Sequence, residues 1–107
     1  MLTLFEENAA ILRNMEADGS DLGPSRSVDF SHVFADRACA DAFAREAKQR
    51  GFSVSVEKVD REGEPWDVTA SKDMVPTCEN ITVTEELLHT LAQAHRGRAD
   101  GWGFFRD

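Results

Sequence analysis

The sequence predicts an α+β fold in which a ferredoxin-like β-α-β-β-α-β unit forms a four-stranded antiparallel sheet with both helices on one face, preceded by an extra helix. Segments that alternate apolar and polar residues are interleaved with segments of helical periodicity. After the first helix, their order is that of the split β-α-β motif. We expect a single domain over residues 1–107, with the extra helix over 1–18 and the core over 28–105.

The N-terminal helix is predicted by a capping box, because Thr3 precedes Glu6 by three residues. Gly19 is expected to end this helix after Asp18, and "GSDLGPSRS" over residues 19–27 is typical of a loop. The helix has one apolar stripe that needs cover, which the second face of the sheet, the end of a helix or a partner chain can provide. The stripe consists of Leu4, Ala9, Ile11, Leu12 and Met15.

The first strand is expected over residues 28–34, where "VDFSHVF" alternates in character. Asp36 can cap the following helix, which Gly51 ends and in which Phe43 is the one large apolar anchor. Alternation places Val28, Phe30, His32 and Phe34 on one face of the strand and Asp29, Ser31 and Val33 on the other. Helical spacing groups Ala38, Ala42, Phe43, Glu46 and Ala47.

The segments "FSVSVEKV" and "WDVTASK" alternate in the same way and are predicted as the second and third strands. A hairpin connection with Gly63 at its turn joins them. We expect the first and third strands at the centre of the sheet, paired in parallel, and the last strand at the edge beside the first. The inward side chains are Phe52, Val54, Val56, Trp66, Val68 and Ala70.

Residues 73–80 are predicted to be irregular because Pro76 interrupts any element there. The pair Thr82 and Glu85 predicts the start of the last helix, with Thr84 as a rival cap, and Gly97 closes it. The buried stripe of this helix is expected to be Leu87, Leu88, Leu91 and Ala94 or His95.

The final strand is predicted in "ADGWGFF", entered through a turn at Asp100 and Gly101. Trp102 and Phe104 then share one face of the strand, while Phe105 lies on the other with Gly103. We expect Trp102 to cover the sheet, so that Trp102→Ala lowers the free energy of unfolding by roughly 3 kcal/mol or more.

The formal net charge of −8, from 20 acidic and 12 basic residues, argues against nucleic acid as a direct partner and fits a basic protein. The other interpretation of this charge is that it only keeps the surface solvated. There is no apolar run long enough for a membrane and no basic leader, which predicts a cytoplasmic protein. The acidic residues form two clusters, Glu6, Glu7, Glu16, Asp18 and Asp21 in the first, and Glu57, Asp60, Glu62, Glu64 and Asp67 in the second.

No pattern of catalytic residues, metal ligands or phosphate-binding glycines emerges, so we expect no enzyme activity, no metal and no cofactor. Cys39 and Cys78 lie in separate segments and are interpreted as reduced thiols. His89 and His95 are six residues apart on one helix, which is not a metal-ligand spacing. The absence of such patterns favours a protein-binding module, and two alternatives to it remain. One is a ligand pocket lined by Trp66, Trp102 and His32, and the other is a homodimer formed through an edge strand.

Several segments, in the same order, resemble the RraB family of ribonuclease E inhibitors. They are an acidic first helix running into "ADGSD", the strand "VDFSH", the segment "RGFSVSVE", the stretch "WDVTASKDMVP" and the close "DGWGFF". The family's fold is ferredoxin-like. The motif residues that the resemblance carries over are Gly19, His32, Trp66, Met74, Pro76, Gly101, Trp102 and Gly103.

The resemblance implies a non-enzymatic regulator that binds the arginine-rich scaffold of ribonuclease E and lowers RNA cleavage, for which an acidic surface is the physical complement. Some family members continue into a long acidic tail, whereas this sequence stops at Asp107, so weaker binding, or binding of a different partner, is expected if that tail contributes. The candidate partner-binding residues are Glu6, Glu7, Asp18, Asp21, Glu57, Asp60, Glu62, Glu64, Asp100 and Trp102.

Overall fold

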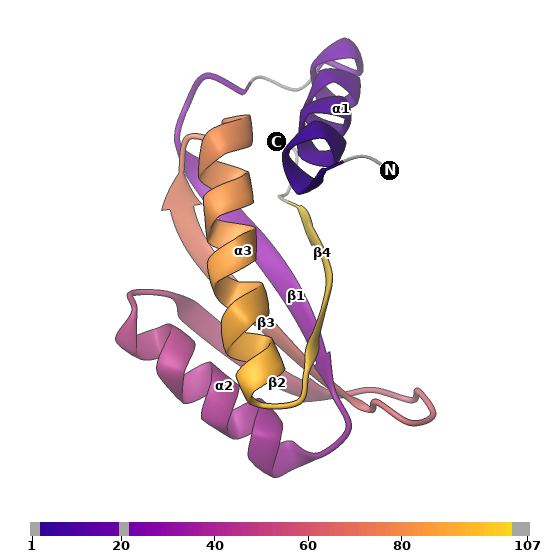
Figure 1. Cartoon of the computed structure of the whole chain (residues 1–107). Coiled ribbons are helices and arrows are strands. Elements are labelled where there is room, and N and C mark those ends of the chain that lie inside the picture. Colours follow the sequence, from indigo (N-terminus) through magenta and orange to yellow (C-terminus); the bar gives the residue numbers. More distant parts are fainter. Residues whose placement is uncertain (1–2, 20–21, 104–107) are drawn as a thin grey trace.

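A four-stranded antiparallel sheet with three helices forms the fold, seen in a computed structural model that describes residues 3–19 and 22–103 (Figure 1). The α+β class is therefore confirmed. The elements are α1 (Leu4–Ala17), β1 (Arg26–Phe34), α2 (Arg37–Gln49), β2 (Ser53–Lys58), β3 (Trp66–Met74), α3 (Cys78–Ala94) and β4 (Arg98–Gly103). Among the described residues, no helix is long and apolar enough to cross a membrane.

The strands lie in the order β2-β3-β1-β4, which confirms that the first and third strands are central and the last lies at the edge beside the first. The expected parallel pairing of β1 with β3 is wrong, because the two pair antiparallel from Arg26 opposite Met74 to Phe34 opposite Trp66. The reason is the hairpin between β2 and β3, which reverses the chain before β3 enters the sheet.

Helices α2 and α3 lie on one side of the sheet (Figure 1), and their apolar residues join those of the central strands in one core. Phe43 of α2 is fully buried, with its ring centroid 5.2 Å from that of Phe34. Gly97 is required where the chain leaves α3, because a Cβ there would lie 2.2 Å from the Phe34 ring. The buried residues of α2 are Ala40, Phe43, Ala44 and Ala47, whereas the predicted Ala38 is exposed.

Helix α3 starts one turn earlier than predicted. Its N-cap is Thr77, whose Oγ1 accepts the Asn80 backbone N–H at 3.0 Å, so the predicted caps Thr82 and Thr84 are wrong. Pro76 precedes this cap, where its missing N–H costs no helical hydrogen bond. The longer helix buries Ile81, Leu88, Leu91 and Ala92, while Leu87 is 38% exposed and Ala94 is exposed.

Helix α1 packs beside the N-terminal half of α3, beyond the end of β4 (Figure 1). The predicted capping box is present, with the Thr3 side chain accepting the Glu6 N–H and the Glu6 carboxylate accepting the Thr3 N–H. The helix ends at Ala17 with Asp18 as its C-cap, and Gly19 follows at a φ of +95°. The side of α3 thus covers the apolar stripe, with Leu12 buried and Ile11 41% exposed.

Strand β4 contains a bulge. Ala99 lies opposite His32 and Gly101 opposite Ser31, so Asp100 is an extra residue without a partner position on β1. Gly101 has a φ of +116°, which favours glycine there. Trp102 lies opposite Phe30 and packs against the core, as predicted, whereas Phe104 and Phe105 lie outside the described residues.

The other face of the sheet, here called the open face, points away from α2 and α3. It consists of the residues that alternate with the core residues along each strand. They are Ser27, Asp29, Ser31 and Val33 of β1, Ser53, Ser55 and Glu57 of β2, Asp67, Thr69, Ser71 and Asp73 of β3, and Arg98, Gly101 and Gly103 of β4.

Candidate functional site

A buried asparagine connects α1, α3 and β4. Asn8 is 2% exposed, and its Nδ2 donates to Thr82 Oγ1 and to Glu85 Oε1, each at 3.1 Å. Its Oδ1 accepts the indole N–H of Trp102 at 2.9 Å. Both ends of the amide are thereby satisfied, which makes its burial tolerable.

Trp102 is one of the predicted partner-binding residues. In the structure its indole ring is half-buried against the core and its N–H is bonded to Asn8. The "DGWG" motif therefore holds α1 in place, through the bulge at Asp100 and the glycines on each side of the indole.

Sequence reasoning missed Asn8. The signal was available, since Asn8 lies midway between Leu4 and Leu12 at four-residue spacing, in the middle of the apolar stripe of α1. A polar residue at such a position needs a partner, and a tryptophan elsewhere in the chain supplies one.

His32 lies in the core between the sheet and α2. It is 1% exposed, and its ring centroid is 4.8 Å from that of Phe43. Burial lowers the pKa of His32 to about 4, and the nearby His89 adds to this, while a backbone hydrogen bond with Phe30 and the Asp100 carboxylate act in the opposite direction. The imidazole is therefore neutral near pH 7. Its Nδ1 has no hydrogen-bond partner among the described residues.

The three residues of the hypothetical ligand pocket do not line either of the two hollows described next. Trp66 lies opposite Phe34, with the Arg37 guanidinium 5.6 Å and the Lys58 Nζ 5.9 Å from the centroid of its ring. Trp102 lies opposite Phe30 and is bonded to Asn8. The buried His32 lies on β1 between Phe30 and Phe34, and therefore between the two tryptophans along the strand.

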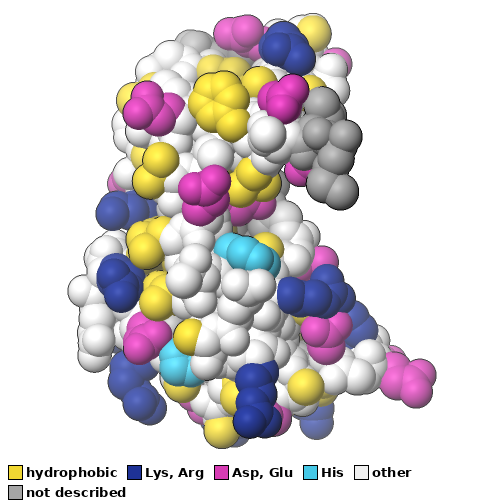
Figure 2. Space-filling model, viewed as in Figure 1, with side chains coloured by type: hydrophobic (Ala, Val, Ile, Leu, Met, Phe, Trp, Pro, Cys, Tyr) yellow, Lys and Arg dark blue, Asp and Glu magenta, His cyan; other side chains and the backbone are white. Residues whose placement is uncertain are grey.

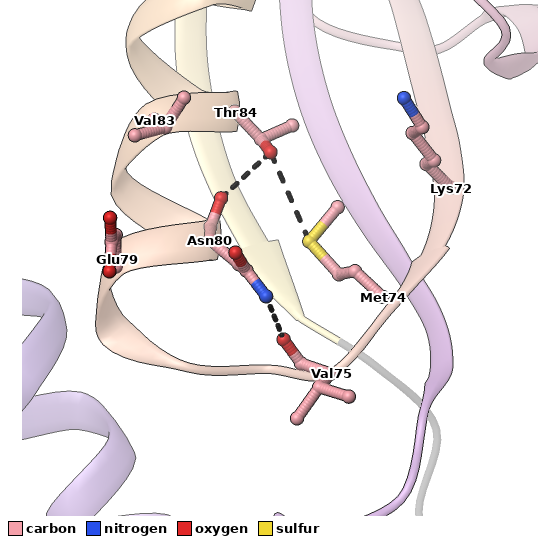
Figure 3. A pocket seen from close by; sticks show the side chains of 7 residues that line it. All are labelled: Lys72, Met74, Val75, Glu79, Asn80, Val83 and Thr84. Carbon is pink, nitrogen blue, oxygen red and sulfur yellow. Dashed lines mark hydrogen bonds between the residues drawn. The ribbon is translucent and has the colours of Figure 1, made fainter.

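One hollow of about 420 Å³ lies between the end of β3 and the start of α3 (Figure 3). Its polar groups bond to one another, with Asn80 Nδ2 donating to the Val75 carbonyl at 2.9 Å and Thr84 Oγ1 to the Asn80 carbonyl at 2.7 Å. Met74, a motif residue, lines this hollow, and the neighbouring Pro76 is buried. We interpret the role of these two motif residues as structural, because they form the turn between the end of β3 and the start of α3.

A second hollow of about 390 Å³ lies at a corner of the open face. Three hydroxyl groups, the Asp73 carboxylate, Lys72 and Gly51 line it, the hydroxyls being those of Ser27, Ser53 and Ser71. Ser71 Oγ also donates to Asp29 Oδ1 at 2.6 Å, which links the hollow to the centre of the face.

The two acidic clusters lie far apart. The first belongs to α1, at the opposite end of the molecule from the β2–β3 connection that carries most of the second (Figure 1). In the first cluster Glu6 completes the capping box, Glu7 is exposed, Asp18 caps the helix end, and Asp21 lies outside the described residues. Asp60 and Glu62 are exposed on the connection, Glu57 on β2 and Asp100 on the bulge of β4.

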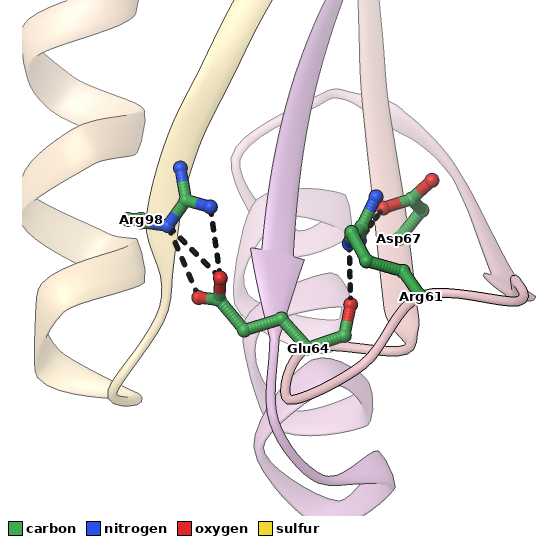
Figure 4. A network of polar contacts seen from close by, with 4 residues as sticks. All are labelled: Arg61, Glu64, Asp67 and Arg98. Carbon is green, nitrogen blue, oxygen red and sulfur yellow. Dashed lines mark hydrogen bonds and ion pairs between the residues drawn. The ribbon is translucent and has the colours of Figure 1, made fainter.

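Glu64 reaches from the connection to β4 and bonds the Arg98 guanidinium (Figure 4). Arg98 Nη2 lies 2.8 Å from Glu64 Oε1, and its Nε lies 3.1 Å from each carboxylate oxygen. This pairing lowers the pKa of Glu64 and raises that of Arg98. Arg61 is likewise engaged, by Asp67 and by the Glu64 carbonyl at 2.7 Å.

Both thiols take part in hydrogen bonds within the chain. The Asp36 side chain, which caps α2, accepts the Cys39 N–H at 2.8 Å and lies 3.5 Å from its Sγ, and this hydrogen bond raises the pKa of the Cys39 thiol. Cys78 Sγ donates to the Phe5 carbonyl at 3.1 Å. Within residues 3–19 and 22–103, no group of His, Cys, Asp and Glu could hold a metal ion.

The family comparison matches nearly the whole chain. The model of the family "Regulator of ribonuclease activity B", RraB, matches residues 5–104, from the first turn of α1 to just beyond β4. No curated protein matches the chain.

Proposed function

This chain belongs to the RraB family of regulators of ribonuclease activity, and we propose that it regulates RNA decay by binding ribonuclease E and not by catalysis of its own. In this proposal the partner segment is the arginine-rich scaffold of that enzyme, and binding lowers RNA cleavage. The observation that carries the proposal is the family match over residues 5–104.

The physical support is electrostatic. A net charge of −8 attracts a basic segment and repels RNA, so the protein is suited to contact the enzyme's scaffold and not its substrate. Charge attraction of this kind weakens as salt screens it.

The same proposal covers the domain boundaries and the fold type. We regard residues 1–107 as one ferredoxin-like domain, which the strand order β2-β3-β1-β4 and the single core support. A homodimer through an edge strand and a small-ligand site remain hypotheses of lower rank, since no contact or bonding pattern described above favours either.

The test is a pull-down of the arginine-rich scaffold segment by the purified chain over a range of salt concentrations. We expect capture at low salt that declines as salt rises. No capture at low salt would contradict the proposal.

A further inference from the structure

The two sides of the molecule differ in charge. On the helix side, acidic and basic side chains are interspersed (Figure 2). Two of the strand lysines belong to this side, since the Lys58 Nζ lies 5.9 Å from the Trp66 ring centroid and the Lys72 Nζ 5.2 Å from that of Phe52. The helix side therefore offers no surface of a single sign.

The open face is predominantly acidic. Its strands carry four carboxylates, and Glu64 reaches onto it from the β2–β3 connection as a fifth. In the described part of the chain two guanidinium groups stand against these, those of Arg61 and Arg98, and both are already bonded to carboxylates. An excess of three negative charges results, and neither Glu57 nor Asp73 has an ion pair within the described part of the chain.

The open face is also accessible and shallow. Among the described residues its one apolar side chain is that of Val33, which is 1% exposed. Asp67 and Arg98 lie on each side of Val33, and the β2–β3 connection covers them. The remaining side chains are short hydroxyls and carboxylates, and β4 contributes only Gly101 and Gly103 in the two rows beside Ser31 and Asp29. A peptide segment that lies along the open face would contact hydrogen-bond acceptor oxygens and meet little steric obstruction.

The hollow at the corner of this face suits a guanidinium group. The hydroxyls of Ser27, Ser53 and Ser71 and the Asp73 carboxylate present oxygen acceptors around about 390 Å³. Lys72 also lines this hollow, and its Nζ lies 5.2 Å from the Phe52 ring centroid on the helix side. An arginine side chain offers five N–H donors in a fixed plane, which several such acceptors can satisfy together.

We propose that the open face is the docking surface for an extended, arginine-rich segment of a partner protein. This inference rests on the proposed function and deepens it, because it assigns the binding to the open face and not to the acidic residues of α1. An extended segment repeats its side chains every two residues, with the same spacing as the rows of the open face beneath it. Charge complementarity to the three excess carboxylates selects a basic segment.

The test compares two triple variants that remove the same charge. The open-face variant carries Asp29→Asn, Glu57→Gln and Asp73→Asn. The control variant carries Glu7→Gln, Glu16→Gln and Glu86→Gln, all exposed positions on α1 and α3. Binding is measured at low salt by fluorescence anisotropy with two probes, a synthetic peptide of alternating arginine and serine and the ribonuclease E scaffold segment.

We expect the open-face variant to bind both probes about tenfold more weakly than the unsubstituted chain and the control variant to bind within about twofold of it. Equal weakening of both variants, or greater weakening of the control, overturns the inference. If the unsubstituted chain binds the synthetic peptide in the expected pattern but not the scaffold segment, the docking surface stands and the proposed function fails. Binding of neither probe overturns both.

A second measurement does not depend on the variants. Titration of the peptide into the isotope-labelled, unsubstituted chain is expected to shift the amide resonances of β1 and β3 at open-face positions. Shifts confined to α1, or to the hollow beside α3, contradict the assignment.

Discussion

The two faces of this sheet are made by the same four strands and have opposite characters. Toward α2 and α3 the strands present Val28, Phe30, Phe34 and Val68, all at most 1% exposed. Toward the open face the alternate residues are serines, a threonine, glycines and carboxylates, together with Val33 and Arg98. The comparison indicates that one face supplies stability and the other remains free for recognition, so substitutions on the two faces should affect different measurements.

The largest effect is expected in the core. Phe43→Ala removes a fully buried ring that contacts His32 and Phe34, and we expect the free energy of unfolding to fall by about 3–5 kcal/mol. Urea denaturation followed by circular dichroism measures this. A decrease in the free energy of unfolding of less than about 1 kcal/mol would show that the core between the sheet and α2 is not the main source of stability.

The buried His32 predicts a dependence of stability on pH. Its pKa is about 4 in the folded chain and 6.5 ordinarily, so the unfolded chain binds more protons between these values and stability is lost as pH falls from 6.5 to 4. The full difference is about 3 kcal/mol. Denaturation at several pH values should show this slope, and His32→Leu should remove it. An unchanged slope in that variant would assign the acid sensitivity to other groups.

Loss of the tie between Asn8 and Trp102 should cost less. Trp102→Phe keeps a ring in place but leaves Asn8 Oδ1 without its indole donor, and we expect a loss of about 1–3 kcal/mol. Combining it with Asn8→Leu should cost less than the sum of the two single changes, because both remove the same hydrogen bond. Additive losses in this double-mutant cycle would contradict the tie.

The smallest effect on stability is expected on the open face. Ser55→Ala and Glu57→Gln alter exposed positions of β2, so each should change the free energy of unfolding by no more than about 0.5 kcal/mol. The same denaturation measurement applies. A loss as large as that of a core substitution would mean that this face is packed and not free.

The sequence predicted the strands and their inward faces well, because period-two alternation is a local property. It did not predict where α3 begins. Thr82 has the capping-box spacing to Glu85, whereas Thr77, the actual N-cap, is followed three residues later by Asn80. The earlier start lets Ile81 reach the core and lets Asn8 of α1 reach the Thr82 hydroxyl. These contacts join distant parts of the chain.

The candidate site shows the same limit more strongly. The two acidic clusters found along the sequence, one in α1 and one mainly in the β2–β3 connection, lie far from each other in the fold (Figure 1). Asp29 and Asp73 join Glu57 on the open face only through the pairing of β1 with β3 and of β3 with β2. Asp29 lies between Val28 and Phe30 in the sequence and Asp73 between Lys72 and Met74, outside both acidic clusters, so clustering along the chain could not reveal these two.

The most direct test of the account is RNA cleavage by ribonuclease E, measured at low salt with the unsubstituted chain and with the variant carrying Asp29→Asn, Glu57→Gln and Asp73→Asn. We predict that the unsubstituted chain slows cleavage and that the variant, folded and equally stable, slows it far less. Cleavage slowed equally by both chains would contradict the role of the open face, and cleavage unchanged by the unsubstituted chain would contradict the proposed regulation.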